Sequence, residues 1–252
     1  MSHSRSSRAR SRSRDRASVA HRLGVPRNLC RQAASFDSPL GLELWASSLL
    51  GQVWERRVRA HAGSDGERML VLAKPILRSF AEIGGSEGRI ALTAVARIDR
   101  GGVGSLASRL AATLHDAAIP GWVAHVGTAT IARAFAHRER GDGEALLLQT
   151  EPVGEIAHML GVYISEPLGG IATALNVMRA IDPLDPEVAG DGVLERFPFR
   201  PVDPVRASGR ALGAIERTES TLGGRVDESF PSVRALAIAR LTPPQSTVGA
   251  TA

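Results

Sequence analysis

The chain has 252 residues, of which 43% are hydrophobic and 23% are charged, so it is long enough to bury a sizeable core in one or two domains. Its single cysteine, Cys30, excludes an internal disulfide framework and a zinc site built from cysteines. No stretch reaches the roughly 18 consecutive apolar residues of a membrane helix, and the N-terminus lacks the apolar region of a signal peptide. We therefore expect a cytoplasmic protein.

Positive charge is concentrated at the N-terminus. The net charge is +5, and residues 1–31 contain nine arginines and one aspartate, whereas acidic residues are in excess over the rest of the chain. The arginine and serine repeats repel one another and bury little apolar surface, which predicts a disordered basic tail over 1–36. We favour a solvated tail without a partner, or an upstream start codon that extends the reading frame; the alternative is that residues 1–31 bind nucleic acid nonspecifically through phosphate contacts.

The segment that follows the tail is predicted to be mainly helical. Five apolar residues after Asp37 recur at helical spacing: Leu42, Trp45, Leu49, Val53 and Trp54. Residues 69–83 form a second helix, bent or interrupted at Pro75, because proline lacks the backbone donor that a helix needs. The apolar stretch 89–98 fits a helix or a strand, and 104–118 is an amphipathic helix.

The sequence pattern in the second half of the chain predicts a small sheet followed by helices. Three strand-like segments, at 129–137, 144–150 and 157–164, predict an antiparallel meander with a turn at Gly141–Gly143. Three further segments are predicted to be helices: 171–180, 203–220 and 231–241. The fold class is therefore α+β, with helices flanking a small antiparallel sheet in one domain over 37–242, and with a disordered C-terminal tail over 243–252.

A glycine-rich motif precedes one of the predicted helices. Residues 102–107 match G-x-G-x-x-A, the pattern of a dinucleotide-binding loop. However, Asp99 and Arg100 interrupt the junction before it, and no acidic residue follows at the distance where the ribose is bound. We favour the alternative that this is a glycine turn in which Ser105 caps a helix, and we expect no cofactor.

Titratable side chains are frequent in the predicted meander: His125, His137, Glu139, Asp142, Glu144, Glu155 and His158. Asp142, Glu144 and His158 are candidate catalytic residues, and His137 and His158 are candidate metal ligands, if neighbouring strands bring them together. No H-E-x-x-H or phosphate-loop motif is present. The alternative is that these groups are solvated or hydrogen-bonded, with His158 in the core or at a strand edge.

Five short segments between residues 38 and 242 form a recognisable set: Ile119-Pro120-Gly121-Trp122 followed by Gly127, Gly141-Asp142-Gly143, His158 before Leu160–Ile164, Leu168-Gly169-Gly170-Ile171-Ala172, and Phe230–Leu241. Together they resemble an uncharacterised family of high-GC actinobacterial proteins, and the resemblance covers residues 38–242. The family has no established activity, so the resemblance implies a shared fold and no reaction.

The sequence favours a non-catalytic binding or regulatory protein, since the H-E-x-x-H and phosphate-loop signatures are missing. The alternatives are a hydrolase that uses Asp142, Glu144 and His158 as acid-base or metal-binding groups, and a nucleic-acid-associated protein that uses its basic tail.

Overall fold

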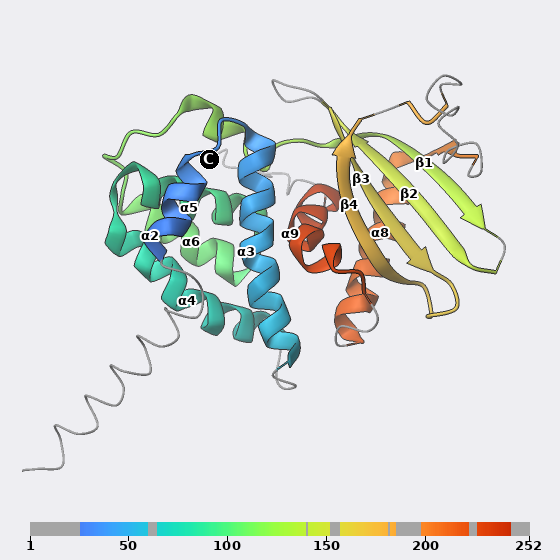
Figure 1. Cartoon of the computed structure of the whole chain (residues 1–252), viewed down its shortest axis with the longest axis horizontal. Coiled ribbons are helices and arrows are strands. Elements are labelled where there is room, and N and C mark those ends of the chain that lie inside the picture. Colours follow the sequence, from blue (N-terminus) through green and yellow to red (C-terminus); the bar gives the residue numbers. More distant parts are fainter. Residues whose placement is uncertain are drawn as a thin grey trace, which may run out of the picture. The chain divides into compact units, whose positions relative to one another are not determined.

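The structure is a computed structural model that describes residues 26–59, 65–139, 141–151, 157–180, 182–184, 198–221 and 226–242 (Figure 1). These residues form seven α-helices, one short 3-10 helix and one five-stranded antiparallel sheet, which confirms the predicted α+β class. The pattern of contacts divides the chain into two compact units. One unit falls within residues 1–46 and 63–124, and the other falls within residues 47–62 and 125–252. The predicted single domain over 37–242 spans both units.

The first unit is built from helices. It contains α2 (Pro26–Ala34), the first part of α3 (Pro39–Arg59), α4 (Asp65–Ile83), α5 (Gly85–Ile98) and α6 (Gly102–Ala112). Helix α5 contacts α2, α4 and α6, so the ambiguous segment 89–98 is a helix rather than a strand. Helix α4 continues through Pro75, and the rings of Trp45 and Phe80 lie 6.2 Å apart.

Helix α2 corrects the predicted boundary of the disordered tail. Residues 26–34 are helical, and Cys30 and Ala33 are fully buried against the helices that α2 contacts, α4 and α5. Two small residues three positions apart give this short helix a buried face that its average hydrophobicity does not indicate. Residues 1–25 and 243–252 lie outside the described residues, so disorder there stays a prediction.

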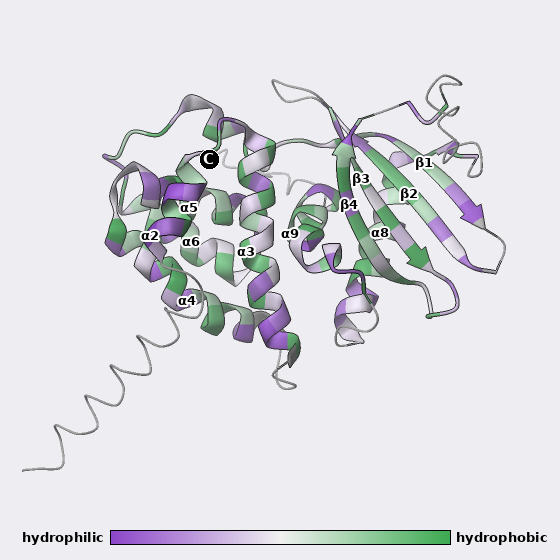
Figure 2. Cartoon of the chain, in the orientation of Figure 1, coloured by the Kyte–Doolittle hydropathy of each residue, from purple (hydrophilic) through white to green (hydrophobic). Residues whose placement is uncertain are grey.

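The second unit contains the sheet. Its strands are β1 (Ile131–Glu139), β2 (Gly143–Thr150), β3 (His158–Ser165), β4 (Ile171–Arg179) and β5 (Arg200–Val202), in the order β4-β3-β2-β1-β5. All neighbouring strands are antiparallel, which confirms the predicted meander over the first three. Figure 2 shows the hydrophobic stretch along β3, whose residues are nearly all buried.

The prediction of a helix over 171–180 is wrong, because this segment is the edge strand β4. Gly169 and Gly170 adopt positive φ angles of 81° and 73°, which turn the chain back so that Ile171 pairs with Ser165. Alanine, leucine and methionine favour a helix locally, but hydrogen bonding along β3 outweighs that preference. Strand β4 also has a buried side: Ala172 and Leu175 are fully buried.

Two helices cover one face of the sheet. Helix α8 (Pro204–Ser220) contacts β1 to β4 and α9 (Ser229–Leu241) contacts β4, as Figure 1 shows. Residues in register across the strands, Ala136, Leu146, Val162 and Leu175, share this face because side chains alternate along a strand. Helix α8 begins where Asp203 accepts a hydrogen bond from the Arg206 N–H at 2.8 Å, which confirms the start predicted for it.

Helix α9 also contacts the second part of α3. The Ser47 hydroxyl accepts a hydrogen bond from the Leu236 N–H at 3.0 Å, and the rings of Trp54 and Phe230 lie 5.8 Å apart. A Cβ at Gly51 would overlap the Pro231 carbonyl oxygen, so glycine is needed for this close approach of the two helices.

The other face of the sheet has a small apolar cluster of its own. Phe135, Leu147 and Met159 are buried there, with Ala180 and Phe199 packed beside them.

Within the described part of the chain, no helix combines the length and the apolar composition that crossing a bilayer demands.

Candidate functional site

His158 lies at the start of β3, where its backbone and ring are held by one neighbour. The Thr150 hydroxyl donates to the His158 carbonyl oxygen at 3.1 Å and lies 3.2 Å from the ring Nδ1. Burial first, and then the positive charge of Arg240, lowers the pKa of His158 from 6.5 to about 4. The imidazole is therefore neutral at neutral pH. His158 is only 7% exposed, which agrees with the alternative that it is a histidine of the core.

Glu144 and Asp142 lie at the opposite end of the same strands. Glu144 pairs in register with Ile164, which is six residues along β3 from His158, so about 20 Å separates the two positions. The buried Glu144 carboxylate accepts a hydrogen bond from the Arg210 guanidinium at 2.6 Å. Asp142 lies in the turn before β2, and its carbonyl oxygen accepts a hydrogen bond from the Glu166 N–H.

His137 lies on the other face of the sheet. It pairs in register with Ala145, one residue from Glu144, and side chains of adjacent residues point to opposite faces. Its ring lies 5.8 Å from the Phe199 ring, and its Nδ1 lies 3.4 Å from the Pro198 carbonyl oxygen. The four candidates thus lie in three places, and no group of three possible metal ligands gathers anywhere in the described residues.

The glycine motif at 102–107 holds a side chain of the chain itself. It follows helix α5 rather than a strand, and one carboxylate oxygen of Asp99 accepts hydrogen bonds from the N–H groups of Gly101, at 2.9 Å, and Gly104, at 2.7 Å. The amides that would bind a phosphate are occupied by this carboxylate, which takes the capping role predicted for Ser105.

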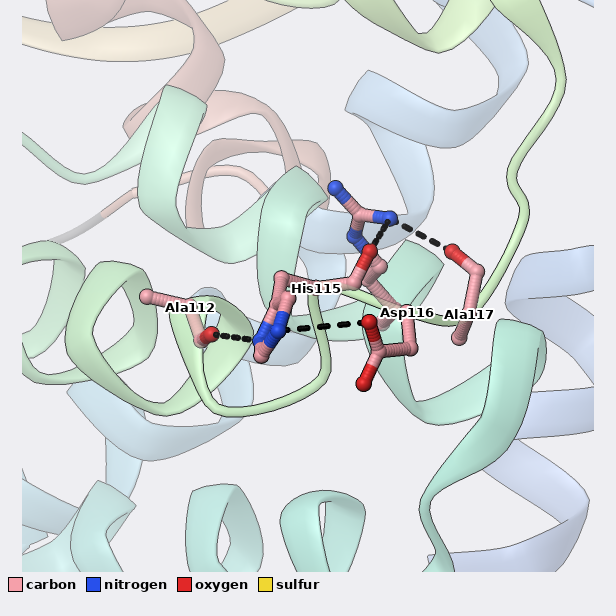
Figure 3. Close-up of polar contacts among 5 residues, drawn as sticks. Ala112, His115, Asp116 and Ala117 are labelled. Atoms are coloured by element: carbon pink, nitrogen blue, oxygen red, sulfur yellow. Dashed lines mark hydrogen bonds and ion pairs between the residues drawn. The ribbon is translucent and has the colours of Figure 1, made fainter.

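A second polar cluster follows α6, in the turn after Ala112 (Figure 3). One nitrogen of Arg89 donates to the carbonyl oxygens of His115, at 2.8 Å, and Ala117, at 2.5 Å. The His115 ring lies between Asp116, at 3.2 Å, and the Ala112 carbonyl oxygen, also at 3.2 Å. The side chains of His115 and Asp116 are 73% and 94% exposed, so this cluster fixes a surface turn and encloses no substrate.

An open groove of about 660 Å³ lies along β5 and the first turns of α8. Among the residues that the structure describes, its lining consists of Val202, Asp203, Arg206, Gly209 and Arg210. Arg210 spans from this groove to Glu144 on the sheet, while the side chain of Arg206 has no hydrogen-bond or ion-pair partner among the described residues. Sequence reasoning missed this groove. The signal was present in the spacing of Arg206 and Arg210, one helical turn apart with Gly209 between them.

Comparison of the chain with protein-family models, curated proteins and solved structures found no match.

Proposed function

We propose that this chain is a non-catalytic binding protein whose ligand lies in the groove between β5 and α8. One observation carries the proposal: an open hollow of about 660 Å³ is lined by two arginines from consecutive turns of one helix. Ligand sites are concave and hold a few polar groups that orient the ligand.

The side chains in the groove are suited to binding rather than to reaction. Arginine stays protonated and only donates hydrogen bonds, so it is a poor general base. The Asp203 carboxylate is engaged by the Arg206 N–H, and the other lining residues, Val202 and Gly209, carry no reactive group. The described lining residues therefore include no pair of nucleophile and base.

The hydrolase alternative has less support from the geometry. Glu144 lies about 20 Å along the strands from His158 and Asp142 lies farther away, whereas an acid and a base that act on one substrate lie within hydrogen-bond reach of it. The nucleic-acid alternative depends on residues 1–31, most of which lie outside the described part of the chain, and it stays a prediction.

Filling the groove at Gly209 tests the proposal. A Cβ at Gly209 meets no atom within 4 Å, so Gly209→Trp places a large ring in the groove without disturbing the helix, and Gly209→Ala is the matched control. A fragment library of anionic, neutral and cationic molecules is screened by ligand-observed NMR against the full chain. We expect hits that Gly209→Ala retains and Gly209→Trp loses; hits that bind all three proteins equally would place binding elsewhere and contradict the proposal.

A further inference from the structure

We infer that the groove recognises an oxyanion group, a carboxylate or a phosphate, carried on a small organic molecule. This inference deepens the proposed function and rests on it. Arg206 and Arg210 bind the anion, and Glu144 positions Arg210 from the sheet.

The two arginines are placed to act on one group. They are four residues apart on α8, so their Cβ atoms lie about 5 to 6 Å apart on the same face of the helix. Guanidinium groups present planar forks of donors that match the oxygens of carboxylates and phosphates. Both side chains border the same groove, so their forks are able to converge there on one oxyanion.

Of the two arginines that line the groove, Arg206 is the one without an ion-pair partner among the described residues. Glu144 is bound to Arg210 at 2.6 Å, and the Asp203 carboxylate accepts a hydrogen bond from the backbone of α8 at 2.8 Å. The Arg206 guanidinium has no such partner among the residues that the structure describes. An anionic ligand supplies that partner, and it uses the Arg210 donors that Glu144 does not.

Gly209 supports close approach of a ligand to the helix. Glycine inside a helix costs about 1 kcal/mol relative to alanine, so its presence there calls for a reason. At Gly51 and Gly104 the reason is packing, because a Cβ would overlap a backbone oxygen. At Gly209, which is exposed, a Cβ would meet nothing within 4 Å, so no described neighbour blocks a ligand from approaching the helix there.

The size of the groove indicates that the anion is part of a larger molecule. A lone phosphate or carboxylate fills only a small part of about 660 Å³, and Val202 offers an apolar contact to the remainder of a ligand. An aromatic or aliphatic acid, or a phosphate monoester, combines both features.

Four probes that share one ring separate charge from shape. Phenyl phosphate and benzoate carry an oxyanion, benzamide is a neutral isostere of benzoate, and benzylamine is a cation. Each is titrated into the full chain, and the amide signals of α8 are followed by NMR. We expect phenyl phosphate or benzoate to bind at least tenfold more tightly than benzamide, and benzylamine not to bind.

Substitution of the arginines tests the site. Arg206→Met keeps the length of the side chain and removes its charge, and it is expected to weaken binding of the anionic probe about tenfold or more. Arg179→Met is the matched control, because Arg179 is an exposed residue of β4, at the opposite edge of the sheet from β5. Since Arg210→Met alone leaves Glu144 buried without its partner, Arg210→Met is combined with Glu144→Leu.

Each outcome decides the inference. Loss of anion binding in Arg206→Met and in the double variant, with wild-type binding in Arg179→Met, supports it. Equal binding of benzamide, binding of benzylamine instead, or anion binding that survives Arg206→Met overturns it, as does the absence of binding at about 10 mM probe. Neutral hits in the fragment screen that Gly209→Trp abolishes would preserve the binding groove while rejecting the anion.

Discussion

His158 shows how the neighbours of one side chain convert a candidate catalytic group into a structural one. Its backbone and ring both meet the Thr150 hydroxyl, and Arg240 lies near enough to oppose its protonation. A histidine that is buried and hydrogen-bonded in this way is neutral at neutral pH. Its position favours a role in joining β2 to β3.

The lowered pKa of His158 predicts a pH dependence of stability. The neutral form is favoured in the folded state, so the unfolded chain binds the proton first as the pH falls below 6.5. The stability that His158 contributes is complete above pH 6.5 and is lost as the pH falls toward about 4, with a slope of at most about 1.4 kcal/mol per pH unit. Urea denaturation at several pH values measures this slope.

His158→Gln removes the titrating group, and we expect it to reduce the slope between pH 6.5 and 4. Ile164→Val, on the same strand, is the control: it costs about 0.5 to 1.5 kcal/mol and should keep the wild-type slope. An unchanged slope in His158→Gln would show that other groups carry the pH dependence.

Cys30 provides a test of helix α2. Burial first, and then the charge of Glu87, raises the pKa of this thiol to about 12, and the side chain is fully buried. Since the thiolate is the reactive form, we expect a chromogenic disulfide reagent to react slowly with the native protein and completely in urea, and Cys30 is the only cysteine. Rapid reaction of one thiol per chain in the native protein would contradict the packing of α2 against α4 and α5.

Helices α3 and α8 show that the same residue type serves opposite purposes in two elements. Gly51 of α3 lies against the backbone of α9, whereas Gly209 of α8 faces open space. Glycine weakens both helices, but only at Gly51 does close packing compensate for that weakness.

Substitution of each glycine by alanine is therefore expected to have opposite effects on stability. Gly51→Ala forces α3 away from Pro231 and should lower the free energy of unfolding by about 1 to 3 kcal/mol. Gly209→Ala should raise it by about 0.5 to 1 kcal/mol. Chemical denaturation of the two variants beside the wild type checks both values, and a shared sign would reject the packing argument.

At the scale of the whole molecule, the unit that contains the sheet depends on a segment distant in sequence. Residues 47–62 belong to this unit, and Ser47, Gly51 and Trp54 contact α9. Trp54 is 2% exposed, and Arg57 and Arg234 lie 6.0 and 5.5 Å from its ring. This part of α3 therefore completes the core beside α9.

A fragment of residues 125–252 lacks that segment, and we expect it to be less stable than the full chain. All three tryptophans precede residue 125, so the fragment contains none. A peptide of residues 39–60 contains two of them, Trp45 and Trp54, and its tryptophan fluorescence therefore reports binding. Binding should shift the tryptophan emission of the peptide to the blue as the Trp54 ring is buried, with a peptide carrying Gly51→Leu as the control that cannot approach α9. No shift on addition of the wild-type peptide would contradict this dependence.

Much of the fold was predictable because its signals are local. The spacing of Leu42, Trp45 and Leu49 predicted α3, the alternation and turn residues predicted β1 to β3, and Asp203 before Pro204 marked the start of α8. Strand β4 was missed because its residues favour a helix, and only pairing with β3 makes them a strand.

The candidate site was less predictable, since a site depends on contacts between distant residues. Neighbours in sequence such as His137 and Glu144 lie on opposite faces of the sheet, while Glu144 and Arg210, 66 residues apart, form an ion pair. The sequence by itself determined the α+β class, most helices and the central strands, because the periods of helices and strands are written in consecutive residues. Only the tertiary structure decided which charged groups meet and where the groove lies, because strand register and helix packing set those distances.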